Sequence, residues 1–206
     1  KQAQIAQWNL WKLANTLQPI INDEKFLENT LNNFGVYFWE THDKMLCKKF
    51  GFDELKEEDE VFFNNWQSLM QDLALDHTLF FNQLEKTTPE TDLQEHFSPV
   101  AYSALNEEKL SRLKDFMENY RSRLNSNAIS KAESVELMKK TNAKFILRNY
   151  LLYQCIEEIS AGKTALLMKL TQALENPYQE LFPEFSVKRP SSYDDTAGCS
   201  TLSCSS

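Results

Sequence analysis

The sequence predicts an all-α protein, and three observations support that prediction. Only four glycines and six prolines occur among 206 residues, whereas average usage would give about fourteen glycines and ten prolines. Apolar residues recur three and four positions apart over much of the chain, which is the period of an amphipathic helix. Hydrophobic residues make up 42% of the chain, so there is enough apolar material for a core.

Two helices are expected at the start of the chain. Apolar residues share one face over residues 3–17, and we expect that helix to end before Pro19 because proline is a common stop signal. The pair Asn22-Asp23 has the residue types that cap a helix, so a second and longer helix begins there. That helix should end at Gly51, since glycine readily adopts the left-handed conformation that terminates helices.

Three more helices are expected in the middle of the chain. The acidic run 57–60 precedes an apolar pattern that reaches residue 73, so we interpret the run as a helix start and not as a metal site. Another helix begins at residue 76 and ends near Pro89, and a polar loop follows as far as Pro99. From residue 106 to residue 124 the helical pattern resumes.

The last part of the pattern predicts three helices and a tail. A short helix at about 130–140 leads into the strongly apolar segment 142–153, which we expect to be a helix buried on most sides. A further helix covers about 163–175. We therefore divide the chain into a helical region, 1–182, and an extended tail without regular structure, 183–206.

The composition argues against several classes of partner. A net charge of −8 is unfavourable for a protein that binds the phosphate backbone of nucleic acids. No run of about 18 apolar residues is present, so no membrane span is expected. The polar first residues lack the core of a signal peptide, which favours an intracellular protein. The chain starts at Lys1 without a methionine, so we expect it to be part of a longer protein.

One apparent nucleotide-binding motif does not fit its expected context. The triplet Gly162-Lys163-Thr164 has the composition of the end of a phosphate-binding loop. Such a loop needs a glycine five residues earlier and a preceding strand, but position 157 is Glu157 in a helical pattern. We therefore interpret Gly162 as a helix terminus and Lys163 as a solvated charge.

The other polar candidates have simpler structural interpretations. His42, His77 and His96 are far apart in sequence and have no partner at zinc-binding spacing, so roles at the surface or core edge are favoured. Arg148 and Asn149 lie in an apolar segment and must find hydrogen-bond partners. We favour a structural network for this pair, and direct contact with a ligand is the alternative.

The chain ends with a cysteine on a polar Ser/Thr segment. Cys204 lies two residues from the carboxyl terminus, with nothing apolar around it in sequence. Because free cysteines are usually buried, a displayed thiol is better explained by reactivity than by packing, although a tail can also carry one by accident. Cys199 is a possible second thiol. Cys47 and Cys155 lie in helical patterns, so core packing is expected for both.

Several segments match, in order along the chain, the landmarks of one known family. They are Gln4–Leu10 with Leu13-Ala14, Leu69-Met70 with Asp76-His77-Thr78 and Phe80-Phe81, Asn142–Leu151, Asn176-Pro177-Tyr178, Lys188-Arg189-Pro190 and Ser203–Ser206. Together they resemble the selenoprotein O family of kinase-like proteins. The chain differs at Ala3 and Ala143, where the family usually has proline.

This resemblance implies an activity for the parent protein. Members of the family bind ATP in a flipped orientation and transfer AMP to Ser, Thr or Tyr hydroxyls of other proteins. The chain would be the C-terminal helical region of such a protein adenylyltransferase. The family's groups for ATP and Mg²⁺ lie before the point where this chain begins, so the resemblance predicts no catalytic, cofactor-binding or metal-binding residue here. The expected partners are the N-terminal nucleotide-binding part of the same protein and the protein substrates.

The resemblance also implies a role for the end of the chain. Many animal members carry selenocysteine at the position of Cys204, which implies a redox function there, including a disulfide that restrains the active-site side. Cys199 does not have the two-residue spacing of a typical redox pair with Cys204. A bacterial member would be cytoplasmic, and a eukaryotic one mitochondrial. The alternative function is a non-catalytic, acidic helical module that binds a protein partner. The chain by itself is expected to be inactive.

Overall fold

The computed structural model describes residues 2–196, 198 and 199, and every regular element in these residues is a helix. The all-α prediction is therefore confirmed. The chain divides into two compact units, which comprise residues 1–47 and 48–206. Within the described residues, no helix combines the length and apolar character needed to cross a lipid bilayer.

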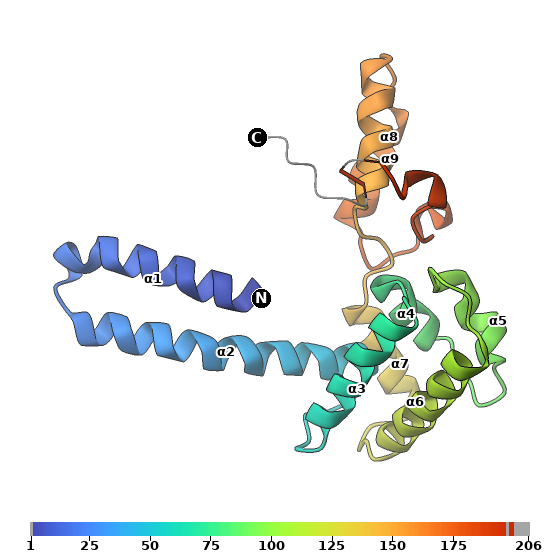
Figure 1. Cartoon of the computed structure of the whole chain (residues 1–206), viewed down its shortest axis with the longest axis horizontal. Coiled ribbons are helices and arrows are strands. Elements are labelled where there is room, and N and C mark those ends of the chain that lie inside the picture. The colour runs from blue at the N-terminus through green and yellow to red at the C-terminus, as the bar shows by residue number, and fades with distance from the viewer. Residues whose placement is uncertain (1, 197, 200–206) are drawn as a thin grey trace. The chain divides into compact units, whose positions relative to one another are not determined.

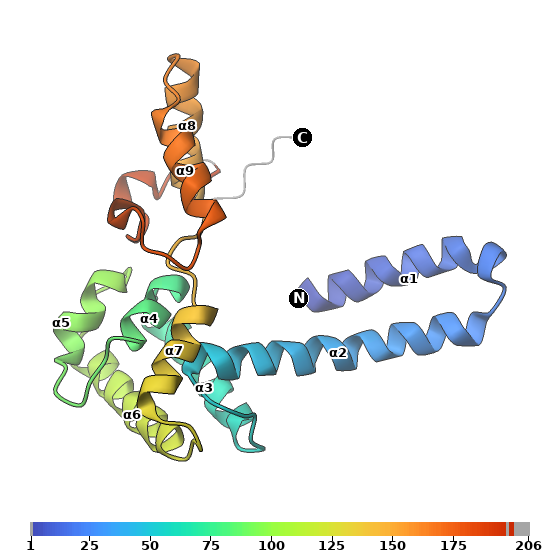
Figure 2. The ribbon, with the colours of Figure 1, turned by 180° about the vertical axis from the view of Figure 1, so that it is seen from behind.

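The first unit consists of two antiparallel helices, α1 (Gln2–Ile21) and the larger part of α2 (Glu24–Phe50) (Figures 1 and 2). The capping prediction is confirmed, because the Asp23 carboxylate accepts a hydrogen bond from the Phe26 amide at 2.9 Å. The expected end of the first helix is wrong, since Pro19 lies inside α1. Proline in the last turn removes only one amide donor there, and the chain turns instead at Asn22, whose φ is 50°.

The second unit begins with five α-helices packed around an aromatic core. They are α3 (Asp59–Asp72), α4 (His77–Leu84), α5 (Leu93–Phe97), α6 (Glu107–Asn125) and α7 (Lys131–Thr141). The fully buried ring of Phe50 lies within 6.5 Å, centroid to centroid, of seven other aromatic rings. Gly51 ends α2 with φ 74°, as the sequence predicts. The acidic run at 57–60 does lie at the start of α3.

One helix lies where the sequence analysis predicts only a loop. Between Pro89 and Pro99 the chain forms α5, and the one-turn 3₁₀ helix η1 (Ser98–Val100) follows it. The Asp92 carboxylate caps α5 by accepting hydrogen bonds from the amides of residues 94 and 95. Leu93 and Phe97 are buried. A helix of five residues is too short to show a clear period in sequence.

The predicted helix over 142–153 begins seven residues later than expected, as α8 (Asn149–Ser160). Residues 142–148 are irregular because their polar groups have partners outside a helix. The Asn142 carboxamide donates to the Lys49 carbonyl oxygen at 2.8 Å and accepts from the Lys49 ammonium at 3.2 Å. The amides of Lys144 and Phe145 both donate to the Pro177 carbonyl oxygen.

The end of the described chain folds back on the last two helices. Helix α9 (Ala165–Glu175) packs against α8, and the 3₁₀ helices η2 (Pro183–Phe185) and η3 (Ser191–Tyr193) follow (Figures 1 and 2). Phe185 and Cys199 are buried in one apolar cluster with Phe145, Tyr150 and Leu151. The expectation that the chain lacks regular structure from residue 183 is therefore wrong for the described part of that segment. Proline and serine content indicates irregular backbone, but it does not show which apolar residues of the segment are buried against the helices.

Candidate functional site

Three of the segments that resemble family landmarks meet at Asp76, the N-cap of α4. Its Oδ1 accepts hydrogen bonds from the Leu79 amide at 3.1 Å and from Arg148 Nη2 at 2.9 Å. Its Oδ2 accepts from Arg148 Nη1 at 2.6 Å and from the Tyr102 hydroxyl at 3.0 Å. The Arg189 amide donates to the same Tyr102 hydroxyl at 3.3 Å. Segments 76–78, 142–151 and 188–190 are thus joined by one polar network.

The electrostatics of Asp76 follow from these contacts. Burial by itself would raise the pKa of Asp76, but the hydrogen bonds from Arg148, Leu79 and Tyr102 and the positive charge of Arg148 together hold it below its usual value. The Asp76 and Arg148 side chains are 6% and 12% exposed. The carboxylate is therefore charged and fully paired, which agrees with the structural network that the sequence analysis favours for Arg148.

A second polar cluster lies at the C-terminal end of α4. The Lys144 ammonium donates to the Glu85 carboxylate at 2.6 Å and to the side-chain oxygen Oδ1 of Asn82 at 3.2 Å. The Asn82 amide group donates in turn to the Ala143 carbonyl oxygen at 3.3 Å. Ser186 donates to the Lys144 carbonyl oxygen at 3.2 Å, which ties the end of the described chain to this cluster.

A cavity of about 320 Å³ adjoins the second polar cluster, and Leu79, whose amide bonds to Asp76, also lines it. Three lysines from separate segments line it, namely Lys86, Lys144 and Lys188. We call it the lysine cavity. Glu180 is the acidic residue in its lining. The arrangement offers several ammonium donors to a single small ligand.

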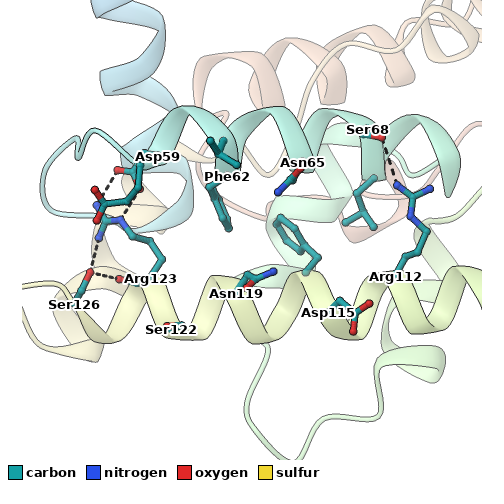
Figure 3. Close-up of a pocket in the computed structure, with 14 residues that line it drawn as sticks. Asp59, Phe62, Asn65, Ser68, Arg112, Asp115, Asn119, Ser122, Arg123 and Ser126 are labelled. Carbon is teal, nitrogen blue, oxygen red and sulfur yellow. Dashed lines mark hydrogen bonds and ion pairs between the residues drawn. The ribbon is translucent and has the colours of Figure 1, made fainter.

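A larger groove, of about 710 Å³, lies between α3 and α6 (Figure 3). The rings of Phe62 and Phe116 stack in it with their centroids 5.2 Å apart. Asn65 on α3 and Asn119 on α6 line opposite walls, and the side chain of Asn65 points toward α6 (Figure 3). An aromatic floor with carboxamides at the rim suits apolar packing combined with hydrogen bonding.

Ion pairs close the two ends of this groove. At one end, Arg123 on α6 binds Asp59 on α3, and Asp59 is completely buried (Figure 3). At the other end, Arg112 contacts Asp72 and donates to Ser68 at 3.4 Å. The buried pair was not predicted from the sequence, because Asp59 is one member of an acidic run that is interpreted only as a helix start. The signal that could have found it is the position of Arg123 on the apolar side of a helical pattern.

The other candidate residues take structural positions. Gly162 follows α8 with φ 77°, which agrees with its interpretation as a helix terminus. His42 contacts Asp43, and His96 contacts the Gln83 carbonyl oxygen. His77 packs its ring near two aromatic rings of the core edge.

The structure describes three of the four cysteines, and all three are buried. Cys47 and Cys155 are buried, as predicted. Cys199 is also buried, as a free thiol in the same apolar cluster as Cys155. Cys204, the predicted redox residue, lies outside the described residues. Burial of Cys199 depends on the return of the chain onto α8 and α9, which no local pattern indicates.

Comparison with known proteins identifies the family. The model of the family described as "Protein adenylyltransferase SelO" matches residues 1–175. The proteins named protein nucleotidyltransferase YdiU from Cytophaga hutchinsonii and from Xanthomonas oryzae pv. oryzae are 32% and 31% identical over 209 and 208 residues. A relative of the same name from Flavobacterium johnsoniae is 30% identical over 213 residues.

These alignments cover 100% of this chain but 40%, 40% and 41% of the three relatives. The chain thus spans about two fifths of the length of the curated relatives it matches. The matched residues include the Asp76–Arg148 network and both walls of the groove. The resemblance stated from the sequence is confirmed, and the chain belongs to the SelO protein adenylyltransferase family.

Proposed function

We propose that this chain is the helical C-terminal region of an enzyme that transfers AMP from ATP to Ser, Thr or Tyr hydroxyls of proteins. In this reaction the hydroxyl oxygen bonds to the α-phosphorus of ATP. The bond between the α-phosphorus and the bridging oxygen breaks, and pyrophosphate leaves with its electron pair. The hydroxyl proton passes to a base. The observation that carries the proposal is the family match across residues 1–175. The bacterial relatives support a cytoplasmic location.

The proposal assigns the ATP and Mg²⁺ contacts to the rest of the protein and a supporting role to this chain. The whole of this chain aligns with about two fifths of each relative, so most of each relative's length is outside the aligned region. We expect the catalytic groups there, and the 206-residue chain alone to be inactive.

The exposed apolar side chains of the first unit support an interaction with the rest of the protein. Trp8, Trp11 and Leu13 on α1 are 57%, 47% and 52% exposed, and Phe26 on α2 is 56% exposed. Large apolar side chains gathered on a hairpin usually mark a surface that another folded part covers. We propose that the N-terminal nucleotide-binding part of the same protein covers some of these exposed side chains.

A labelling experiment tests the assignment of activity. The full-length protein and the 206-residue chain are incubated separately with Mg²⁺, a protein acceptor and ATP labelled at either the α- or the γ-phosphate. We expect protein labelling only by the full-length protein and only from the α-label. Labelling from the γ-phosphate would indicate phosphate transfer. AMP transfer by the shorter chain would contradict the assignment of the catalytic groups, and no transfer by either would favour the alternative, a non-catalytic binding module.

We also propose that Cys204 is a redox-sensitive thiol, on the basis of the family resemblance of Ser203–Ser206. In this proposal Cys204 forms a disulfide with a second thiol of the protein. An external disulfide such as oxidised glutathione accepts the two electrons and leaves as two reduced molecules. Cys199 is the nearest thiol in sequence, but its burial among apolar side chains limits its access to another thiol.

The redox proposal is tested in the full-length protein by the ratio of AMP transfer with and without reductant. We expect Cys204→Ser to abolish the change in this ratio, whereas the neighbouring control Ser203→Ala retains it. If Cys204→Ser leaves the ratio unchanged, Cys204 is not the redox residue. Cys199→Ser in the same assay shows whether Cys199 is the second thiol.

A further inference from the structure

The lysine cavity contains a positive charge that the described residues do not balance. The Lys188 ammonium is half-buried and donates to the Ala101 carbonyl oxygen at 2.5 Å. It also lies 6.0 Å from the centroid of the Tyr102 ring. Among the ion pairs of the described residues, none includes Lys188. A neutral carbonyl and a ring face offset only part of the cost of removing an ammonium from water.

The other charges around the cavity leave this excess in place. Lys144 is neutralised by Glu85. Lys86 is exposed and, in the described part of the chain, forms no ion pair. Glu180 is exposed and likewise forms no ion pair with a described lysine. Lys86 and Lys188 therefore both line this cavity without an ion-pair partner among the described residues, and Glu180 in the same lining opposes only part of their charge. The lining thus carries a local positive excess in a chain of net charge −8.

The hydrogen-bonding capacity of the lining fits a phosphate group. Each ammonium has three N–H donors. Lys188 uses one of them within the protein, and Lys144 uses two. A phosphate monoester offers several strong acceptor oxygens and about two negative charges, so it can satisfy the remaining donors at once. The volume of about 320 Å³ lies at the lower end of the range of about 300–1,000 Å³ found for ligand pockets, which indicates a small ligand.

We propose that the lysine cavity binds a small phosphate-bearing molecule, with its phosphate held by Lys86, Lys144 and Lys188. The apolar residues Leu79 and Val100 contact the remainder of the molecule. Bound there, the ligand bridges α4 to the segment at 186–188, and it stabilises the fold-back of the described C-terminal residues. This site does not depend on the proposed AMP transfer.

The test is a titration of the 206-residue chain, followed by amide chemical shifts in ¹H–¹⁵N NMR spectra, with inorganic phosphate and with glycerol 3-phosphate. Sodium chloride at matched ionic strength measures non-specific effects. We expect saturable shifts at residues around the cavity with both phosphates and not with chloride. A preference for glycerol 3-phosphate indicates a phosphate monoester, whereas equal affinities indicate the free anion.

Substitutions then assign the binding to these lysines. We expect Lys86→Gln and Lys188→Gln each to weaken binding at least about tenfold. The control Lys163→Gln removes an exposed lysine that is not in the cavity lining and should leave affinity unchanged. Lys188 also donates a hydrogen bond to the Ala101 carbonyl oxygen, so Lys188→Gln could weaken binding by destabilising the fold. If Lys188→Gln lowers the melting temperature, the affinity of Lys86→Gln alone tests the proposal. Absence of saturable binding, or wild-type affinity in Lys86→Gln, would overturn the proposal.

Discussion

Arg123 and Asp59 form a buried, two-pronged ion pair that joins the end of α6 to the start of α3. Arg123 Nε lies 2.6 Å from Asp59 Oδ1, and Arg123 Nη2 lies 2.9 Å from Oδ2. The same guanidinium donates to the Glu54 carbonyl oxygen at 2.8 Å and to the Asn127 side chain at 3.1 Å. It thus organises the loop before α3 and the turn after α6 around one charge.

Breaking this pair should strongly destabilise the second unit. We expect Arg123→Met to lower the free energy of unfolding by about 3–5 kcal/mol, because Asp59 would remain buried without a counter-ion. Urea unfolding followed by circular dichroism measures the loss. The matched control is Arg112→Met, which breaks an ion pair between the same two helices whose side chains are 43% and 45% exposed. It should cost less than about 1 kcal/mol, and equal losses for the two variants would contradict this interpretation.

The Asp76 network should contribute through both charge and hydrogen bonding. We expect Arg148→Met to lower the free energy of unfolding by about 2–3 kcal/mol, and Tyr102→Phe, which removes one neutral donor, by about 1 kcal/mol. Arg121→Met is the control, since Arg121 makes one exposed hydrogen bond to the Thr88 carbonyl. If Arg148→Met were as mild as Arg121→Met in urea unfolding, Arg148 would not be part of a stabilising network.

The lowered pKa of Asp76 predicts a dependence of stability on acid. The carboxylate is favoured more in the folded than in the unfolded protein, so its contribution is fully present above the unfolded pKa of about 3.9. It is lost as the pH falls through the lower, folded-state pKa. The difference in unfolding free energy between wild type and Asp76→Asn should therefore be constant near neutral pH and shrink below about pH 4. A difference that grows on acidification would show that the sign is wrong.

Two glycines with similar backbone angles should respond differently to alanine. Gly51 and Gly162 have φ values of 74° and 77°. A Cβ on Gly51 would lie 2.9 Å from the Ser134 carbonyl oxygen and 3.0 Å from Met138 Cγ, whereas a Cβ on Gly162 would meet nothing within 4 Å. We expect Gly51→Ala to cost about 2–4 kcal/mol and Gly162→Ala only the backbone term of about 1–2 kcal/mol. Thermal unfolding of the two variants compares these costs, and a larger loss for Gly162→Ala would contradict the packing around Gly51.

The buried cysteines should be protected from alkylation. Cys155 and Cys199 lie in one apolar cluster, so neither thiol is available to a reagent in the folded protein. We expect iodoacetamide to modify both at least about tenfold more slowly in buffer than in concentrated urea. Mass spectrometry of peptic fragments measures the two rates separately. Rapid native modification of Cys199 would mean that the cluster opens readily at this position.

The local patterns of the sequence were sufficient for most helices. Asp23, Asn106 and Ser130 each cap a helix in the structure, and such caps depend on residues only three positions apart. Patterns failed at Pro19, which was expected to end a helix, and at segment 142–148, where partners distant in sequence hold the backbone. A search with a helical period also cannot detect the five residues of α5.

The candidate sites needed more than local pattern. The sequence directed attention to Arg148 as a polar group in an apolar segment, but its partner Asp76 lies 72 residues away. The lysine cavity joins Lys86, Lys144 and Lys188, and no spacing relates these positions. Cys199 lies in the segment that was expected to be an extended tail, and it is buried in an apolar cluster.

By itself, the sequence determined the helical class, most helix starts and the family, because periodicity, capping and ordered landmarks are properties of neighbouring residues. Tertiary structure alone decided which charges are buried and paired, such as Asp59 with Arg123, and where ammonium groups gather around one cavity. The physical reason is that burial and electrostatic pairing depend on distances in space between helices, and those distances are set by the packing of the whole core around Phe50.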